Sequence, residues 1–280
     1  MNKFKVQNPN QKARKPVFAK KSFGQNFLVD QNYIDKIISA LNPAKNETII
    51  EIGAGRGALT EKLVESGANV IAIELDRDLI PVLQEKFGEK ENFKLVQSDA
   101  LEIDFHRFTK VEDKTINVKL VANLPFYIST AILQKLIEQR DCFSEMILMF
   151  QREVVRRITA QPSNSERGFL TVLTEAYLTA DQLFDVPPNA FRPAPKVWSS
   201  VMRLITKNVN EISVENENLF RKVVSASFLQ KRKTIFNNLK NKFVDVERVF
   251  NECQIDSNRR AETLTLEEWI CLARRFELHL

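Results

Sequence analysis

A cluster of glycines in a glycine-poor chain is the feature that most restricts how this protein can fold. Of the seven glycines in 280 residues, three lie within five positions, Gly53, Gly55 and Gly57, in the run EIGAGRGALT. The cluster follows a β-branched run and opens an amphipathic stretch, which predicts a strand, a tight turn and a helix. A turn without Cβ atoms lets a ligand approach the backbone closely. The spacing Gly-x-Gly-x-Gly differs from the dinucleotide pattern Gly-x-Gly-x-x-Gly, so a pyrophosphate is not the expected ligand.

The same strand-then-helix pattern repeats along much of the chain. Short runs rich in Val and Ile, such as NVIAIE, INVKLVAN and EMILMF, alternate with stretches whose apolar residues recur at helical spacing. This alternation predicts an α/β fold, with a mostly parallel, Rossmann-like sheet and helices on both of its faces. Sheets of this kind bind their ligands at the carboxyl ends of the strands.

The composition divides the chain into three expected segments. Residues 1–25 form a basic N-terminal segment, residues 26–207 the domain that contains the sheet, and residues 208–280 a small helical domain of about four helices. The second boundary lies where the sequence turns polar, near KNVNEISVEN. Before it, four prolines between positions 187 and 195 predict an extended loop between two strands.

The net charge of +5 is unevenly distributed. Residues 1–25 and 218–244 each carry seven Lys or Arg and no acid, and subtracting these fourteen leaves 27 basic against 36 acidic residues. Two cationic segments on an acidic body indicate a polyanionic partner, with nucleic acid the first choice. The alternative is a solvated tail and a solvated helix face. Arg152, Arg156 and Arg157 are further candidates for phosphate contacts, unless they pair with neighbouring acids.

The sequence disfavours metal, disulfide and membrane chemistry. The three cysteines, Cys142, Cys253 and Cys271, lack zinc or disulfide spacing, so we expect buried reduced thiols. The only two histidines, His106 and His279, leave little for a His-based metal centre. No apolar run approaches the roughly 18 residues of a membrane span, and the N-terminus lacks the apolar part of a secretory signal. We expect a cytoplasmic monomer without a metal.

Two acidic residues follow the glycine turn at the ends of the next two strands. Glu74 lies 21 residues beyond Gly53, where a carboxylate can accept hydrogen bonds from both ribose hydroxyls. Asp99, in VQSDAL, ends the third strand and is suited to an adenine amino group. Adenosine without phosphate, joined to a positive sulfonium, fits this acidic rim, which predicts S-adenosylmethionine as the cofactor. The alternative for each acid is a helix N-cap or a solvated strand end.

The run VANLPFYIST ends the fourth strand on Asn123, Leu124, Pro125 and Phe126. Hydrogen bonds from an adenine amino group to the Asn123 side-chain oxygen and the Leu124 carbonyl would free the nitrogen lone pair for methyl transfer. Pro125 fixes the turn, and Phe126 stacks on a base that has left its helix or loop. Alignment and dipoles then carry the catalysis, without a group of shifted pKa. The alternative is a strand-ending Asn-Pro turn with a core phenylalanine.

Together these motifs resemble the ribosomal RNA adenine N6,N6-dimethyltransferases. KKSFGQNFLVD is similar to the family's N-terminal signature, EIGAGRGALT to its cofactor loop and NLPFYIST to its catalytic motif. VPPNAFRPAPKVWSSVMRL and FLQKRKTIFNNL resemble its later blocks, so the likeness covers nearly the whole chain. The resemblance implies that the following residues line the S-adenosylmethionine site: Asn26, Leu28, Gly53, Gly55, Glu74, Asp99 and Asn123.

The resemblance also implies a substrate, the 16S rRNA of the small ribosomal subunit precursor, modified at two adjacent adenines near its 3′ end during ribosome biogenesis. Phe126 and Phe191 are expected on opposite faces of the target adenine. The family usually has Tyr and Asn at positions 126 and 127, whereas Phe126 and Tyr127 keep a stacking ring but lose one hydroxyl at position 126. The residues expected on RNA phosphates are Arg221, Lys222, Lys231, Arg232 and Lys233.

Other functions remain open at this point. Within the family, one branch methylates a 23S rRNA adenine and confers macrolide resistance, and another serves as a mitochondrial transcription factor. The length of 280 residues and the long helical tail favour the small-subunit branch. From a different class, the chain could be a mainly non-catalytic ribosome assembly factor. A dinucleotide-dependent dehydrogenase is opposed by the glycine spacing.

Overall fold

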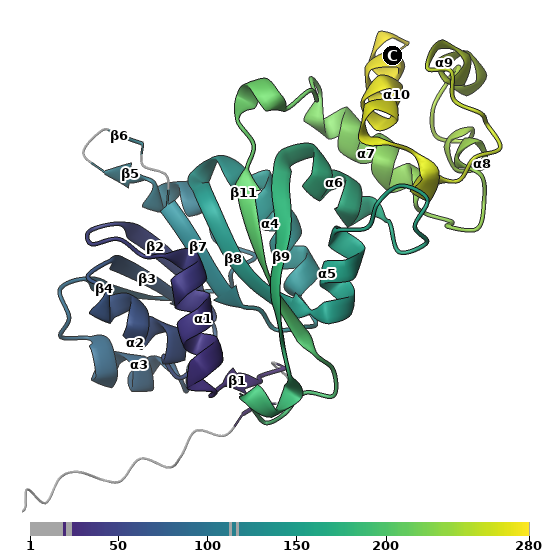
Figure 1. Ribbon diagram of the computed structural model, residues 1–280. Helices are drawn as coiled ribbons and strands as arrows, with labels where there is room; N and C mark the ends of the chain where they lie inside the picture. Colours follow the sequence, from purple (N-terminus) through teal and green to yellow (C-terminus); the bar gives the residue numbers. More distant parts are fainter. Residues whose placement is uncertain (1–18, 21–23, 112–113, 116–117, 280) are drawn as a thin grey trace, which may run out of the picture.

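The computed structural model describes residues 19–20, 24–111, 114–115 and 118–279. Within these residues a seven-stranded sheet runs in the order β4-β3-β2-β7-β8-β11-β9 (Figure 1). Its strands are β2 (Thr48–Ile52), β3 (Asn69–Glu74), β4 (Phe93–Gln97), β7 (Val118–Asn123), β8 (Phe143–Gln151), β9 (Leu178–Val186) and β11 (Ser199–Thr206). Neighbours from β4 to β8 are parallel, while β11 is antiparallel to both β8 and β9. The α/β prediction is therefore confirmed.

Helices cover both faces of the sheet. They are α1 (Gln31–Leu41), α2 (Ala58–Glu65), α3 (Ile80–Phe87), α4 (Ser129–Glu138), α5 (Arg152–Ile158) and α6 (Phe169–Tyr177). Successive residues of a strand point to opposite faces, and Ile49 and Ile50 of β2 accordingly belong to two different buried clusters. Ile49 packs with residues of α1 and α2, and Ile50 belongs to the cluster that includes α4 and α6. The continuous apolar runs seen in the sequence are explained by this burial on both faces.

Helix α1 begins where its capping residue predicts. The Asp30 side chain accepts a hydrogen bond from the Asn32 backbone N–H, so the N-cap expected at this position is present. The apolar residues Ile34, Ile37 and Leu41 fall on one face and are buried. The helix ends at Asn42, whose φ of 46° lies in the left-handed region that asparagine tolerates.

Short elements join distant parts of the chain. Strand β1 (Phe27–Leu28) pairs with β10 (Phe191–Arg192), which lies in the proline-rich loop between β9 and β11. Near the bottom of Figure 1, this pair lies beside the carboxyl ends of the parallel strands. A second pair, β5 (Lys110–Val111) with β6 (Lys114–Thr115), lies at the upper left of the same view. Most of the basic segment predicted at residues 1–25 lies outside the described residues.

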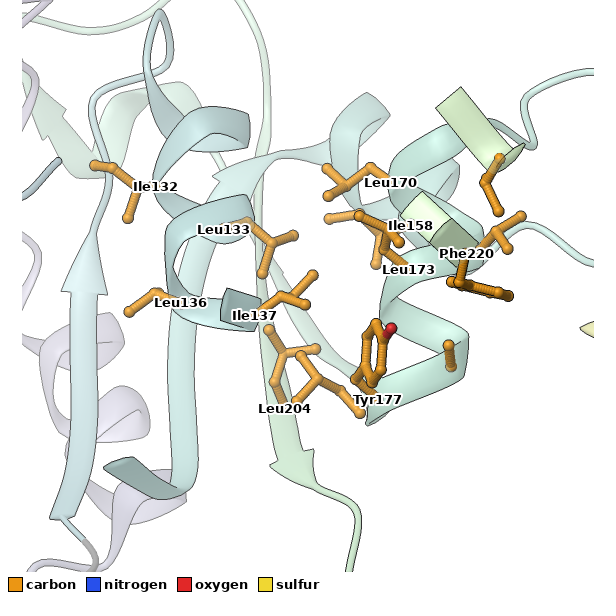
Figure 2. Close-up of a cluster of buried hydrophobic side chains, with 14 of the residues drawn as sticks. Ile132, Leu133, Leu136, Ile137, Ile158, Leu170, Leu173, Tyr177, Leu204 and Phe220 are labelled. Atoms are coloured by element: carbon orange, nitrogen blue, oxygen red, sulfur yellow. The ribbon is translucent and has the colours of Figure 1, made fainter. Parts of the chain in front are cut away.

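Four α-helices follow residue 208 in the described part of the chain: α7 (Glu217–Ser227), α8 (Ile235–Leu239), α9 (Val246–Glu252) and α10 (Leu266–Leu278). One buried cluster runs from the sheet through α4 and α6 into these helices, and Tyr177 of α6 meets Phe220 of α7 edge to face. Figure 2 shows this contact, with Leu133 and Ile137 of α4 on the other side. Because the packing is continuous, the domain boundary near residue 208 stays a prediction.

The expectation of three reduced cysteines is wrong for two of them. Cys253 and Cys271 form a disulfide across a Cα–Cα distance of 5.9 Å. They are 18 residues apart in sequence, but Cys253 directly follows α9 and Cys271 lies in α10, which packs against α9. Tertiary packing thus brings together two residues whose spacing gave no signal. Cys142 is free and buried, as expected. No helix among the described residues is long and apolar enough to span a bilayer.

Candidate active site

A cavity opens at the carboxyl edge of the sheet, where β2, β3 and β7 end. Four groups of residues line it: 24–27 from the N-terminal segment, the turn after β2, the end of β3, and the run that follows β7. The wall is completed by Ser98 and Ala100 after β4, by Leu79 before α3 and by Ile132 of α4. This is the edge at which a parallel sheet is expected to bind its ligand.

The glycine turn is held by the next strand. Gly53 donates its N–H to the Ile73 carbonyl at 2.8 Å, and Gly55 donates to Oε2 of Glu74 at 2.8 Å. Both glycines have positive φ, 74° and 59°, where side chains are disfavoured. Gly57, with φ 84°, has no room for a side chain, because a Cβ there would lie 2.5 Å from the Phe87 ring. The turn therefore leaves open backbone facing the cavity.

Glu74 lines the cavity at the end of β3 and is 6% exposed. Its Oε1 accepts the Asp76 N–H at 2.8 Å, while Oε2 accepts that of Gly55. Burial raises the pKa of the Glu74 carboxyl, and the hydrogen bonds from Asp76 and Gly55 oppose that rise. Each oxygen keeps a further lone pair, so the carboxylate can still accept hydrogen bonds from a ligand.

Glu51 is a second buried acid next to the turn. Its Oε2 accepts a hydrogen bond from the Thr60 hydroxyl at 2.6 Å, and the residue is 2% exposed. Burial raises the pKa of Glu51 to about 7, with the Thr60 bond acting against the rise. It lines a neighbouring cavity that also includes Gly53, Gly55 and Asn123.

The Asn123 carboxamide is held in one orientation at the rim of the cavity. Its Nδ2 donates to the Asn26 backbone carbonyl at 3.2 Å, which directs Oδ1 away from that contact. Among the described residues no group donates a hydrogen bond to Oδ1, so this oxygen is available as an acceptor. Leu124 is tied to the neighbouring strand through its N–H, which donates to the Met149 carbonyl at 3.4 Å. Sequence reasoning expected this acceptor role for Asn123.

The turn after Asn123 places two aromatic rings. The Pro125 carbonyl accepts the Ile128 N–H at 3.2 Å, and the Phe126 carbonyl accepts the Ser129 hydroxyl at 3.1 Å. Phe126 is half-buried and lines the cavity. Tyr127 is 57% exposed and packs on Gly24, where a Cβ would lie 3.2 Å from the tyrosine ring. The second aromatic residue thus contacts the N-terminal segment.

Two expected cofactor residues lie beside the cavity, not in its wall. Asp99 turns its Oδ1 to the Leu101 N–H at 2.9 Å, and its neighbours Ser98 and Ala100 form the wall. This is a local turn contact that leaves Oδ2 without a hydrogen bond to the described residues, so the adenine contact of Asp99 stays a prediction. Leu28 is 5% exposed and lines the adjacent cavity with Phe27 and Asn123.

Phe191 does not fit the role expected from the sequence. Its side chain is fully buried, it belongs to the cluster that contains α1 and α2, and its backbone pairs with Leu28. A ring with no exposed face cannot stack on a base in this conformation. The structural reason is the β1–β10 pairing, which turns the residue into the interior and leaves Phe126 as the aromatic residue at the cavity.

Sequence reasoning missed three residues near the cavity, Lys20, Gln25 and Asp76. Asp76 is 1% exposed, and Gln25 and Asp76 both line the cavity. Lys20 Nζ lies 2.5 Å from Oδ1 of Asp76. The signal available was weak: Gln25 precedes Asn26 in a run already assigned to the site, and Asp76 follows Glu74 by two positions.

The basic residues expected on RNA have different surroundings. Arg221 is paired with Glu138 of α4 at 2.7 Å, and Lys231 donates to the Ser165 carbonyl. Lys222 is exposed and lines an open groove between α4 and α7 together with Lys242. Arg232 and Lys233 are exposed.

The three arginines after β8 can now be placed as well. Arg156 and Arg157 are exposed. The Arg152 guanidinium lies over the Trp198 ring, 5.4 Å from its centroid, and 3.6 Å from Asp185. The expected alternative, pairing with neighbouring acids, therefore holds for Arg152 through Asp185 of β9.

Comparison with known proteins gives a consistent result. The family model described as "Ribosomal RNA adenine dimethylase" matches residues 18–277. A ribosomal RNA small subunit methyltransferase A from Clostridium botulinum (strain Loch Maree) is 43% identical over 252 residues, covering 89% of this chain and 90% of that protein. The protein of that name from Lactococcus lactis is 39% identical over 260 residues, covering 91% and 88%.

Solved structures agree on the fold. A dimethyladenosine transferase from Plasmodium falciparum superposes with a TM-score of 0.75 at 24% identity, covering 90% of this chain and 98% of that one. The 23S rRNA methyltransferase ErmE superposes with a TM-score of 0.66 at 24% identity, covering 90% and 100%. At these identities the two structures support the architecture alone.

Proposed function

The chain belongs to the ribosomal RNA adenine dimethylase family, and from that premise we propose that it dimethylates N6 of two adjacent adenines near the 3′ end of 16S rRNA. The methyl donor is S-adenosylmethionine. Relatives about 40% identical over nine tenths of the chain carry the name of a small-subunit enzyme, which favours the small subunit over the 23S alternative. The modification belongs to ribosome biogenesis, and the proposed partner is the small-subunit precursor.

The observation that carries the proposal is the orientation of Asn123. With Nδ2 bound to the Asn26 carbonyl, Oδ1 is left to accept a hydrogen bond from an amino group at the cavity. The Leu124 carbonyl supplies a second acceptor in the same turn. Two acceptors that bind the N–H groups of an exocyclic amine favour a tetrahedral nitrogen, whose lone pair is no longer delocalised into the ring. The turn sets the direction in which that lone pair points. Phe126 stacks on the base that carries the amine.

The residues of the cavity suit the cofactor. S-adenosylmethionine, when bound, supplies a methyl group on a positively charged sulfur. Glu74 has acceptor capacity for the ribose hydroxyls, and the positive-φ turn at Gly53 and Gly55 exposes backbone where a side chain would block the approach. Asn123 and Leu124 would hold the amine nitrogen toward that methyl group, whose transfer would break the carbon–sulfur bond of the donor and release a proton from the nitrogen to solvent. Asn123 and Leu124 need only orient the amine, so no residue of the chain has to act as a strong base.

We propose that residues 208–280 form the RNA-binding part of the molecule. Lys222, Arg232 and Lys233 are exposed, so phosphates can reach them without breaking an ion pair. Arg221 would have to leave Glu138, and we therefore assign it a smaller contribution.

We further propose a cytoplasmic monomer that acts without a metal ion. Among the described residues the one grouping with metal-ligand spacing is His106, Asp141 and Cys142. It lies where the chain enters β8, at the opposite edge of the sheet from the cavity. The two carboxylates Asp104 and Asp141 already occupy both ring nitrogens of His106.

The proposal is tested by incubating the purified protein with labelled S-adenosylmethionine and unmodified 30S and 50S particles in parallel, then mapping the label. Label on two adjacent 16S adenines is the expected result. Label on 23S rRNA would instead assign the chain to the macrolide-resistance branch. If neither particle is labelled although the protein binds 30S particles, a non-catalytic assembly factor is the better description.

A further inference from the structure

Lys20 and Gln25 meet at a buried acid on the rim of the cofactor cavity. Lys20 Nζ lies 2.5 Å from Oδ1 of Asp76 and 2.6 Å from Oδ2 of Asp78. Gln25 Nε2 donates to the other oxygen of Asp76 at 2.8 Å, and its Oε1 accepts the Lys20 backbone N–H at 2.8 Å. Asp76 is 1% exposed, so its charge depends on these partners.

The residues after Gln25 connect this acid to the proposed catalytic amide. Asn26 donates its side-chain Nδ2 to the Gly24 carbonyl at 3.1 Å, which tightens the turn around Gln25. The Asn26 carbonyl then accepts Nδ2 of Asn123 at 3.2 Å. Only two bonded residues, Gln25 and Asn26, separate the buried acid from the group that has to face the substrate.

Residues 27 and 28 fix the other end of this short segment. They pair with Phe191 and Arg192, and the Arg56 guanidinium lies 4.4 Å from the Phe27 ring centroid. The segment 24–28 is therefore held on one side by Asp76 and on the other by β10. At its first end the Asp76 contact acts together with the Tyr127 ring, which packs on Gly24.

We propose that Lys20, Gln25 and Asp76 form a clamp that positions the Asn123 carboxamide for methyl transfer. This inference rests on the proposed function and assigns positioning roles to three residues that touch neither the methyl group nor the target nitrogen. If the Asn123 carboxamide turned by about 180°, its NH₂ group would take the place of Oδ1. The target amine is itself a hydrogen-bond donor, so it would then face a donor in place of an acceptor. The clamp disfavours the turned orientation because it holds the Asn26 carbonyl, which accepts the hydrogen bond from Nδ2 of Asn123.

The clamp also joins the two ligand sites. Glu74 accepts the Asp76 backbone N–H, so the residue proposed to hold the ribose is bonded directly to the acid of the clamp. A cofactor that orders Glu74 therefore also orders Asp76, Gln25 and, through Asn26, the amide. Positioning of the substrate acceptor is thereby linked to occupancy of the cofactor site.

The test compares Lys20→Met, Lys20→Arg and the double variant Lys20→Met/Asp76→Asn with the wild type. Lys90→Met, an exposed lysine after α3 at the opposite edge of the sheet, is the matched control. The methylation rate at saturating cofactor and 30S particles is measured, together with calorimetry of S-adenosylmethionine binding. Lys20→Met is expected to lower kcat about tenfold or more, because small misplacements of a reacting group cost this much. Lys20→Arg should restore most of the rate.

A second readout does not depend on activity. The side-chain NH₂ resonances of Asn123, assigned by their loss in Asn123→Ala, should shift in Lys20→Met and in the double variant, but not in Lys90→Met. The double variant leaves no unpaired charge at Asp76, so it stays folded if Lys20→Met alone does not. If the wild-type protein methylated neither 30S nor 50S particles, the proposed function would be wrong. The Asn123 resonances would still show whether Lys20 and Asp76 position the carboxamide.

Two results would overturn the clamp. One is an unchanged Asn123 resonance in both variants. The other is a Lys20→Met protein in which cofactor affinity falls and kcat does not, since Lys20 would then serve the cofactor alone.

Discussion

At the carboxyl edge of the sheet, Glu51, Glu74 and Asp76 are each less than a tenth exposed, and hydroxyl, backbone and ammonium donors surround them. On the C-terminal helices, by contrast, Lys222, Arg232 and Lys233 are exposed to solvent. The first region holds its acidic side chains in place before any ligand arrives. The second presents its charged side chains to solvent, where a polyanion can reach them. The difference matches the two ligands: a small cofactor requires preset geometry, whereas rRNA phosphates require mainly charge.

The largest effect is expected for Asn123→Ala, at the carboxyl edge of the sheet. Loss of a fixed acceptor is expected to lower kcat about a hundredfold to a thousandfold, by analogy with the removal of one donor from an oxyanion hole. Binding of 30S particles should remain within about twofold, because the phosphate contacts are proposed for other residues. The rate is measured at saturating S-adenosylmethionine, so that a change in cofactor affinity does not enter kcat. Asn32→Ala, an exposed asparagine in α1, is the control. A normal kcat in Asn123→Ala would contradict the comparison, because the fixed geometry at the carboxyl edge of the sheet would then not determine the rate of methyl transfer.

The buried acid Glu51 predicts a pH dependence of stability. Its pKa is about 7 in the folded protein, above the ordinary value of 4.5, so the unfolded chain ionises first as pH rises. Stability is therefore lost between about pH 4.5 and 7, by at most about 3 kcal/mol at 1.36 kcal/mol per pKa unit. Glu51→Gln should flatten this part of the curve in urea unfolding measured from pH 4.5 to 8. Glu65→Gln, in the exposed C-terminal turn of α2, should not. Equal slopes in all three proteins would show that Glu51 is not neutral when buried.

Substitutions of Phe126 test whether the carboxyl edge of the sheet, which is proposed to bind the cofactor, also binds the target base. Phe126→Leu should weaken the use of RNA by roughly 1–3 kcal/mol, the range measured for loss of one stacked base. Phe126→Tyr keeps the ring and should retain most of kcat/KM. The comparison is made with 30S particles at saturating cofactor. Equal losses in both variants would argue for a packing role against the cavity wall.

The smallest expected effect is a difference in RNA binding between two neighbouring basic residues of α7, Arg221 and Lys222. Lys222→Ala should reduce the salt dependence of 30S binding by up to about 0.7–0.9 in the log–log slope, the value for one phosphate contact. Arg221→Ala should change the slope less, because Glu138 already holds that guanidinium. Filter binding at several salt concentrations gives both slopes. The reverse order would mean that RNA displaces Glu138 and that the exposed lysine is a bystander.

Much of the cofactor edge could be predicted from the sequence because its parts follow one another in simple units. Gly53 follows β2, while Glu74 and Asn123 end β3 and β7. The fold brings these strand ends to one edge, so the three residues could be grouped from strand order alone. The alternation of short apolar runs with helical stretches likewise specified the sheet. These predictions required no knowledge of contacts between side chains.

Contacts between distant segments could not be predicted in this way. The bond between Lys20 and Asp76 joins residues 56 positions apart, and that between Arg140 and Glu217 spans 77. The burial of Phe191 depends on pairing with β1, and the Cys253–Cys271 disulfide depends on how α9 packs on α10. Periodicity and capping describe one element at a time. They carry no information about which side chains two separate elements bring together.

Because Phe27 and Leu28 are held by Phe191 and Arg192, the rim of the cavity is assembled from the beginning and the later part of the chain. A ribosome that has made only the first half has already produced the glycine turn and Glu74, but not the strand that anchors residues 27 and 28. The nascent chain therefore completes its methyl-donor pocket late in translation, and a prematurely terminated product lacks the anchor that would close it.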